Sequence, residues 1–181
     1  INYSMRQHVF PPQTRAVNVA FLQNIPIRTL HSIELFGSKI KALIERHTCR
    51  DLYDVYNLLH SELIKDFDLA ILRKIVLFYL AVGGSEQPST QYDLIGIKQI
   101  KFPQIRATLL PMLKKGDAFD FETAKTEVVA FLEKLLQWTD SEIAFIESFV
   151  AKQYKPELLF SDAEIIHNIC NHPMAHWKVR E

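Results

Sequence analysis

The chain has 181 residues, of which 48% are hydrophobic, so it can bury a core of its own. Its 21 basic and 21 acidic side chains cancel, which argues against a general nucleic-acid coating protein. The longest apolar run, residues 75–82, is far shorter than the roughly 20 residues that cross a bilayer, so no membrane span is expected. Cys49 and Cys170 form neither a disulfide framework nor a CxxC pair, and this predicts reduced thiols and a cytoplasmic location.

The first 30 residues have the composition of strands. β-branched and aromatic residues alternate in part over 1–10 and 16–30, with breaks at Pro11, Pro12 and Pro26, which predicts two or three short strands. So few strands are not stable alone. We therefore expect them to complete a sheet begun earlier in a longer chain, or to be covered by helices. The first residue is Ile, which also suggests a fragment.

From Ser32 onward, apolar residues recur three and four positions apart, which is typical of helices. Hydroxyl residues at Thr139 and Ser161 each precede a Glu by three positions and predict helix starts, while Gly83 and Gly116 are plausible stops. The expected fold is mainly α, a helical bundle after two or three short strands (α+β overall), with residues 1–30 as the strand part and 31–181 as the helical part. After two helices within 32–59, further helices are expected at about 66–82, 91–99, 103–114, 120–138, 140–153 and 162–170.

Residues 37–59 carry a row of charges beside the apolar stripe. On one continuous helix, Arg46 and Arg50 would lie about 20° to either side of Lys39, and Asp54 about 60° away. One interpretation is ordinary intrahelical ion pairs, Arg46–Asp54 or Arg50–Asp54, each contributing a few tenths of a kcal/mol. The other is half of a phosphate-binding site. Residues 1–50 hold seven cations and two acids, a local charge of +5, which favours an anion-facing side.

The stretch ELFGSKIKALIERHTCRDLYDVYNLL resembles the signature of the AbiEii/AbiGii toxin family of nucleotidyltransferase-like proteins, close to K-x-x-A-L-x-x-R-x-x-x-R-D-x-x-D. The N-terminal INYSMR and PP, and the late ELLF and NHPMAHWK, also resemble members of that family, so the likeness covers most of the chain. Gly37 stands where the family often has Ala. The matching residues are Lys39, Ala42, Leu43, Arg46, Arg50, Asp51 and Asp54.

This resemblance implies a nucleotide site. Lys39, Arg46 and Arg50 would contact phosphates, and Asp51 and Asp54 would be catalytic residues that support the cleft. It also implies that the strands belong to a nucleotidyltransferase-type sheet, that the full-length protein uses Mg²⁺ and a nucleoside triphosphate (NTP), that a cognate antitoxin is a partner, and that an RNA such as tRNA is a possible acceptor.

The carboxylates that hold the metal are missing from the strand region, because residues 1–33 contain no Asp or Glu. Two stretches of this chain resemble the missing Asp-x-Asp pair and phosphate-binding turn, but they are less favoured as catalytic motifs. The Asp66–Asp68 pair opens a helix, where Asp caps, and the turn at 83–85 ends one. We therefore expect the metal-binding motifs upstream of Ile1, no bound cofactor in this fragment, and no activity of this fragment alone.

Three other interpretations stay open. The chain could be a non-enzymatic helical interaction module with a basic docking face, or a sequence-independent nucleic-acid binder, although its cations are dispersed. A zinc site is less favoured, because structural zinc sites pair ligands on two segments, and Pro173 instead predicts a last short helix. The candidate zinc ligands are His167, Cys170, His172 and His176.

Overall fold

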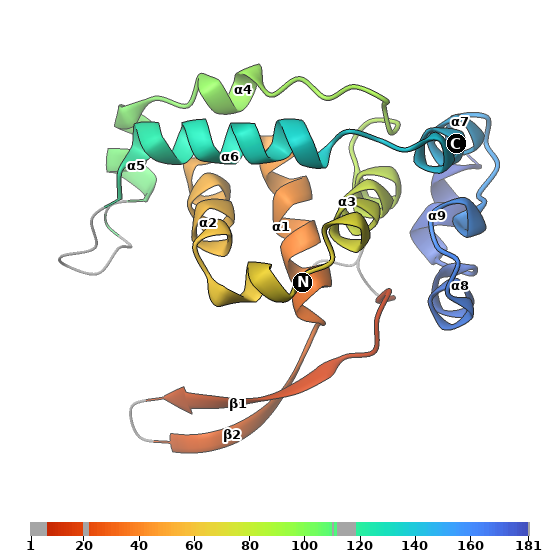
Figure 1. The fold of residues 1–181 in the computed structure, drawn as a ribbon, viewed down its shortest axis with the longest axis horizontal. Coiled ribbons are helices and arrows are strands. Elements are labelled where there is room, and N and C mark those ends of the chain that lie inside the picture. The colour runs from red at the N-terminus through yellow and green to blue at the C-terminus, as the bar shows by residue number, and fades with distance from the viewer. Residues whose placement is uncertain (1–6, 20–21, 110, 112–118, 181) are drawn as a thin grey trace.

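The computed structural model describes residues 7–19, 22–109, 111 and 119–180 (Figure 1). An N-terminal β-hairpin lies beside a bundle of helices, as expected for an α+β chain that is mainly helical. The elements up to residue 83 are β1 (Gln13–Val19), β2 (Leu22–Thr29), α1 (Ser32–Arg46), α2 (Cys49–Leu59), the 3₁₀ helix Glu62–Asp66 and α3 (Leu69–Gly83).

The second half of the chain is also helical, and each helix predicted there is found, over a shorter described stretch than predicted. Residues 110 and 112–114 of the predicted helix 103–114, and the predicted stop at Gly116, lie outside the described residues. The elements are α4 (Ile95–Lys98), α5 (Phe102–Thr108), α6 (Phe121–Leu135), α7 (Asp140–Val150), the 3₁₀ helix Pro156–Leu158, α8 (Ala163–Ile169) and α9 (Pro173–Lys178).

The hairpin corrects two details of the strand prediction. β1 pairs with β2 antiparallel from Gln13 opposite Thr29, and Pro26 lies within β2 opposite Ala16, so the expected break at Pro26 is wrong. A proline is tolerated there because, among the described residues, no third strand needs its missing N–H. Residues 7–10 are not a strand, and residues 1–6 lie outside the described part.

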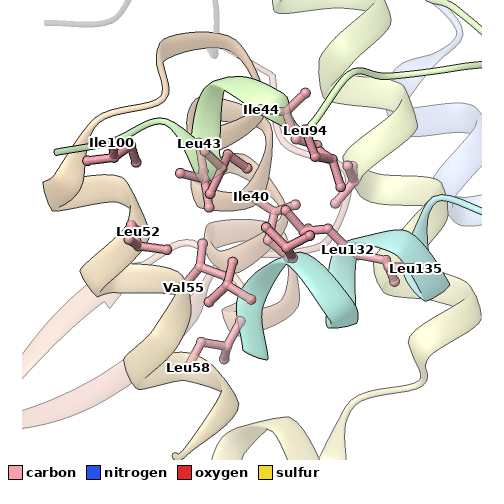
Figure 2. Packing of buried hydrophobic residues seen from close by; sticks show 14 of the residues in the cluster. Ile40, Leu43, Ile44, Leu52, Val55, Leu58, Leu94, Ile100, Leu132 and Leu135 are labelled. Carbon is pink, nitrogen blue, oxygen red and sulfur yellow. The ribbon is translucent and has the colours of Figure 1, made fainter. Parts of the chain in front are cut away.

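One core joins α1, α2 and α6 with the segment around α4. Figure 2 shows how aliphatic side chains from these elements meet between the helices. Ile40 and Leu43 of α1, Leu52 and Val55 of α2, and Leu132 of α6 are all fully buried there. Burial of each such side chain is worth about 1.5–3 kcal/mol, so this cluster holds the α1–α2 pair in place.

α3 is buried on nearly all sides because it lies between two clusters. Leu72, Val76 and Leu80 face the first core, while Phe78 and Tyr79 belong to a second core shared with α7, α8 and α9. A helix that is apolar all round is expected in such an interior position. The aromatic residues of the second core are therefore packing residues. None of the helices among the described residues is long and apolar enough to cross a membrane.

The predicted helix starts are correct at one site and one residue off at the other. At α7 the Thr139 side chain and the Glu142 carboxylate satisfy each other's backbone N–H groups, forming the expected capping box. At α8 the cap is Asp162, whose carboxylate accepts from the N–H groups of Glu164 and Ile165, so the prediction of Ser161 is wrong. Asp is as good a cap as Ser, and the sequence SDAE offers both.

Gly37 lies where α1 crosses α3, and a Cβ there would clash with the Cγ2 methyl of Ile75. We expect Gly37→Ala to lower the free energy of unfolding, because overpacking costs about 1–3 kcal/mol while the gain in helix propensity is only about 1 kcal/mol. Urea unfolding of Gly37→Ala, Ile75→Ala and the double variant checks this. The double variant should lose less than the sum of the two single variants; strict additivity would contradict the crossing contact.

Candidate functional site

The charged span 37–59 is an α-hairpin and not one helix. α1 ends at His47, which has a left-handed backbone (φ 49°) and whose N–H bonds to the carbonyl of Leu43. Thr48 then caps α2, its hydroxyl oxygen accepting from the N–H of Asp51 at 3.2 Å. The two helices expected within 32–59 are therefore confirmed, but the expectation that Lys39, Arg46, Arg50 and Asp54 share one face, which assumed a continuous helix, is wrong. Lys39 and Asp54 instead face each other across two packed helices.

Lys39 and Asp54 meet across this pair of helices. The Lys39 Nζ atom lies 2.7 Å from the Asp54 Oδ2 atom, and the two side chains are 41% and 39% exposed. Both predicted intrahelical pairs, Arg46–Asp54 and Arg50–Asp54, are replaced by this contact. Because both groups reach solvent, a ligand can approach the ammonium and the carboxylate.

Arg46 and Asp51 form a second, tighter pair at the closed end of the α-hairpin. The guanidinium donates from Nη2 to Oδ1 at 2.6 Å and from Nε to Oδ2 at 3.1 Å, and the Thr48 hydroxyl donates to Oδ2 at 2.6 Å. Asp51 is 4% exposed and Arg46 is 60% exposed. Such a two-pronged contact is geometrically specific. Asp51 thus ties the turn together, while the other edge of Arg46 faces solvent.

Arg50 is directed toward α5. It is exposed, and its Nε atom donates to the carbonyl of Thr108 at 3.2 Å. The neighbouring Cys49 thiol is buried beside the Thr108 hydroxyl at 2.9 Å. The structure therefore places Arg50 beside a different helix from the one that carries Lys39.

A pocket of about 300 Å³ opens between α1 and α2 beside the Lys39–Asp54 pair. This volume is at the lower end of the range for small-molecule sites, about 300–1,000 Å³. Of the five predicted site residues, only Lys39 and Asp54 line it. The remaining lining residues are Leu35, Phe36, Asn57, Leu58 and Ser61.

A model of the nucleotidyl transferase AbiEii toxin family, of type IV toxin-antitoxin systems, matches residues 1–148. The chain belongs to this family. The match runs from the N-terminus through the hairpin and the α1–α2 pair and ends within α7, so α8 and α9 follow it. Comparisons with curated proteins and with solved structures found no match. Membership of the AbiEii family implies an antitoxin as a partner.

The described residues of this AbiEii chain do not fit a magnesium site. Asp51 is engaged by Arg46 and Thr48, and Asp54 is engaged by Lys39. Over the described part of the chain, no group of three or more His, Cys, Asp or Glu side chains could hold a metal ion. Asp68 caps α3, accepting from the N–H of Ala70 at 2.8 Å, and so has the structural role expected for it.

The histidine cluster of the AbiEii chain packs as helix, as the position of Pro173 indicated. His172 precedes α9 and is buried against the Phe78 ring, with ring centroids 5.4 Å apart. His176 contacts the carbonyl of Cys170 at 2.8 Å through its Nε2 atom. Burial, and to a smaller extent the nearby His176, lowers the pKa of His172 below the ordinary value of 6.5.

This lowered pKa predicts a loss of stability in acid. Below about pH 6.5, His172 is protonated in the unfolded chain but stays neutral in the folded chain. The free energy of unfolding therefore decreases as the pH is lowered, by at most about 1.4 kcal/mol per pH unit from this group. Urea unfolding between pH 7.5 and 5.5 measures the slope. His172→Leu should flatten it, and His167→Gln at an exposed position should not. Equal slopes in all three proteins would contradict the assignment.

The sequence prediction missed the pocket residues on α2. Asn57 follows Asp54 by three residues within α2, so the helical period places it on the same face, whereas Ser61 lies just beyond the end of that helix and is placed by the chain that follows it. On α1, Leu35 precedes Lys39 by four residues and so lies one turn before it on the same face. Their spacing could have identified them, but the motif drew attention only to charged residues.

Proposed function

We propose that this chain supplies the phosphate-binding side of the NTP site in an AbiEii nucleotidyltransferase toxin. The observation that carries the proposal is the Lys39–Asp54 pair, drawn from two helices at 2.7 Å and set at the mouth of a pocket of about 300 Å³. Lysine offers a compact charge that suits phosphate oxygens. Family membership supports the same reaction class.

The roles follow from exposure. In nucleotidyl transfer, an acceptor hydroxyl attacks the α-phosphorus, the bond to the bridging oxygen breaks, and pyrophosphate leaves. Lys39 binds the phosphate oxygens and stabilises their charge. Asp54, released from Lys39, is available to accept the hydroxyl proton, whereas Asp51 is occupied and positions Arg46. Arg46 and Arg50 are secondary phosphate contacts, Arg50 from the α5 side.

In this proposal the β1–β2 hairpin forms part of a larger sheet. Two strands alone are marginal in water, and both outer edges of the β1–β2 pair lack a partner strand among the described residues. In this proposal residues 1–30 complete the nucleotidyltransferase sheet, and residues outside this chain supply the carboxylates for Mg²⁺. An RNA such as tRNA is the proposed acceptor, and a cytoplasmic location is proposed for a chain whose Cys49 and Cys170 are not joined in a disulfide.

The alternative of a basic docking module has less support. Three of the seven cations in residues 1–50 are neutralised in ion pairs, Lys39 with Asp54, Lys41 with Glu45 and Arg46 with Asp51. These three side chains therefore contribute no net charge to a basic docking face in the unliganded protein.

Equilibrium binding of an NTP to the full-length protein, with and without Lys39→Ala, tests the proposal. Lys39→Ala is expected to weaken binding. If NTP affinity does not depend on Lys39, α1 does not carry the phosphate-binding residues.

A further inference from the structure

The α1–α2 pocket has an apolar end that the phosphate contact does not use. Leu35, Phe36 and Leu58 line it, and Leu35 is 41% exposed although it is a large aliphatic residue. The Phe36 ring is held against the ring of Phe67, with centroids 5.8 Å apart. Apolar walls with a fixed aromatic ring suit a flat heterocycle in a site of this size.

Polar groups lie at the edge of this apolar end. Asn57 is exposed, and no hydrogen bond found within the described ranges uses its side-chain amide. That amide offers both donors and an acceptor. The Ser61 hydroxyl donates to the carbonyl of Leu58 at 2.8 Å, which leaves its oxygen able to accept. One pocket therefore combines an apolar wall, an uncommitted amide and, through Lys39, a positive charge.

We propose that this apolar end holds the base of the NTP, with Asn57 contacting the edge of the base. The inference rests on the proposed function, because Lys39 at the same pocket is the charge that selects a phosphate-bearing ligand. The volume of about 300 Å³ fits a ring system and not a folded peptide segment. Asn57 is then a specificity residue and Lys39 an affinity residue.

The test compares four NTPs with inorganic tripolyphosphate, which has the charge but no base. Binding to the full-length protein is measured with Mg²⁺ for the wild type, Asn57→Ala, Leu35→Trp and Lys39→Ala. Leu69→Trp is the matched control, because Leu69 is also an exposed leucine, 48% accessible, but does not line the pocket.

We expect Asn57→Ala to weaken at least one NTP roughly 2- to 10-fold, the effect of one lost hydrogen bond, and to change the order of preference among bases. Leu35→Trp should weaken all four NTPs about tenfold or more by filling the apolar end. Neither change should alter tripolyphosphate affinity by more than about twofold. Lys39→Ala should weaken NTPs and tripolyphosphate alike.

Three results would overturn the base site. These are wild-type affinities in Asn57→Ala and Leu35→Trp, an equal loss of NTP and tripolyphosphate in those variants, and an equal effect of Leu69→Trp. The proposed function fails separately, if Lys39→Ala leaves both ligands unchanged. If the pocket instead takes an apolar side chain of a protein partner, Leu35→Trp will impair that complex and no NTP, which also overturns the base site.

Discussion

Replacing Lys39 with alanine in the full-length protein is expected to weaken NTP binding roughly 10- to 100-fold. A hydrogen bond to a charged group is worth about 1.5–3 kcal/mol, and each 1.4 kcal/mol is a factor of ten in affinity. In the structure the Lys39 ammonium is held by one carboxylate, Asp54, from which phosphate oxygens can displace it. Isothermal titration calorimetry measures the affinity, and transfer of a labelled nucleotide measures activity.

Stability must be separated from binding in this experiment. The Lys39–Asp54 pair is about 40% exposed on both sides, so its loss should change the free energy of unfolding by less than about 1 kcal/mol. Lys41→Ala is the matched control. Lys41 lies on the same helix but bonds to Glu45 at 2.5 Å and to the carbonyl of Gly83 at 2.7 Å, away from the pocket. Lys41→Ala should retain NTP affinity.

The variants Lys39→Arg and Asp54→Asn distinguish charge from geometry. Lys39→Arg keeps the charge and should retain part of the affinity. Asp54→Asn removes the competitor of the phosphates, so triphosphate binding should strengthen while transfer is lost. An equal loss of binding in Lys39→Ala and Lys41→Ala would show that the effect is structural, and the phosphate assignment would then be wrong.

Removing the Glu34 carboxylate is expected to be the most destabilising single change considered. Glu34 is fully buried in α1 and accepts hydrogen bonds from the N–H groups of Val9 at 3.0 Å and Phe10 at 3.1 Å and from the Tyr79 hydroxyl. Burial and the adjacent Glu34 raise the pKa of Tyr79, so the phenol remains protonated and donates. The carboxylate thus joins the segment before β1 to α1 and α3.

Glu34→Ala leaves three donors without an acceptor, two of them buried (the Val9 N–H and the Tyr79 hydroxyl) and one partly buried (the Phe10 N–H). Each unsatisfied group costs about 1–3 kcal/mol, so we expect a loss of about 3 kcal/mol or more in the free energy of unfolding. Urea unfolding measures the loss, and amide hydrogen exchange at Val9 reports release of the N-terminal segment. Tyr79→Phe removes one donor and should cost less. If Glu34→Ala loses less than about 1 kcal/mol, the buried network does not support the fold.

The Glu34 contact also bears on function. It positions the chain immediately before the hairpin against the helix that carries Lys39. We therefore expect Glu34→Ala to lower transfer activity at temperatures where the protein is still folded, because the hairpin and Lys39 would no longer be held in one arrangement.

The sequence determined much of this protein locally. Apolar periodicity located the helices, Thr139 and Pro173 marked starts that the structure confirms, and the row from Lys39 to Asp54 identified the family. These features depend on residues a few positions apart. Backbone propensity, capping and motif spacing are all short-range properties, so they can be recognised from the sequence without knowledge of the tertiary structure.

The tertiary structure decided which charges meet. Two helices were predicted within 32–59, but not how they would pack; the break between them lies at His47, a non-glycine residue with a left-handed backbone. Because the chain reverses direction there, the charges of the two helices meet in pairs: Lys39 contacts Asp54, and Arg46 contacts Asp51. The pocket that Asn57 lines lies between the same two helices. Glu34 likewise becomes a buried acceptor only because α3 and residues 9–10 converge on it. Such pairings depend on the packing of separate helices, which the order of residues along one helix does not specify.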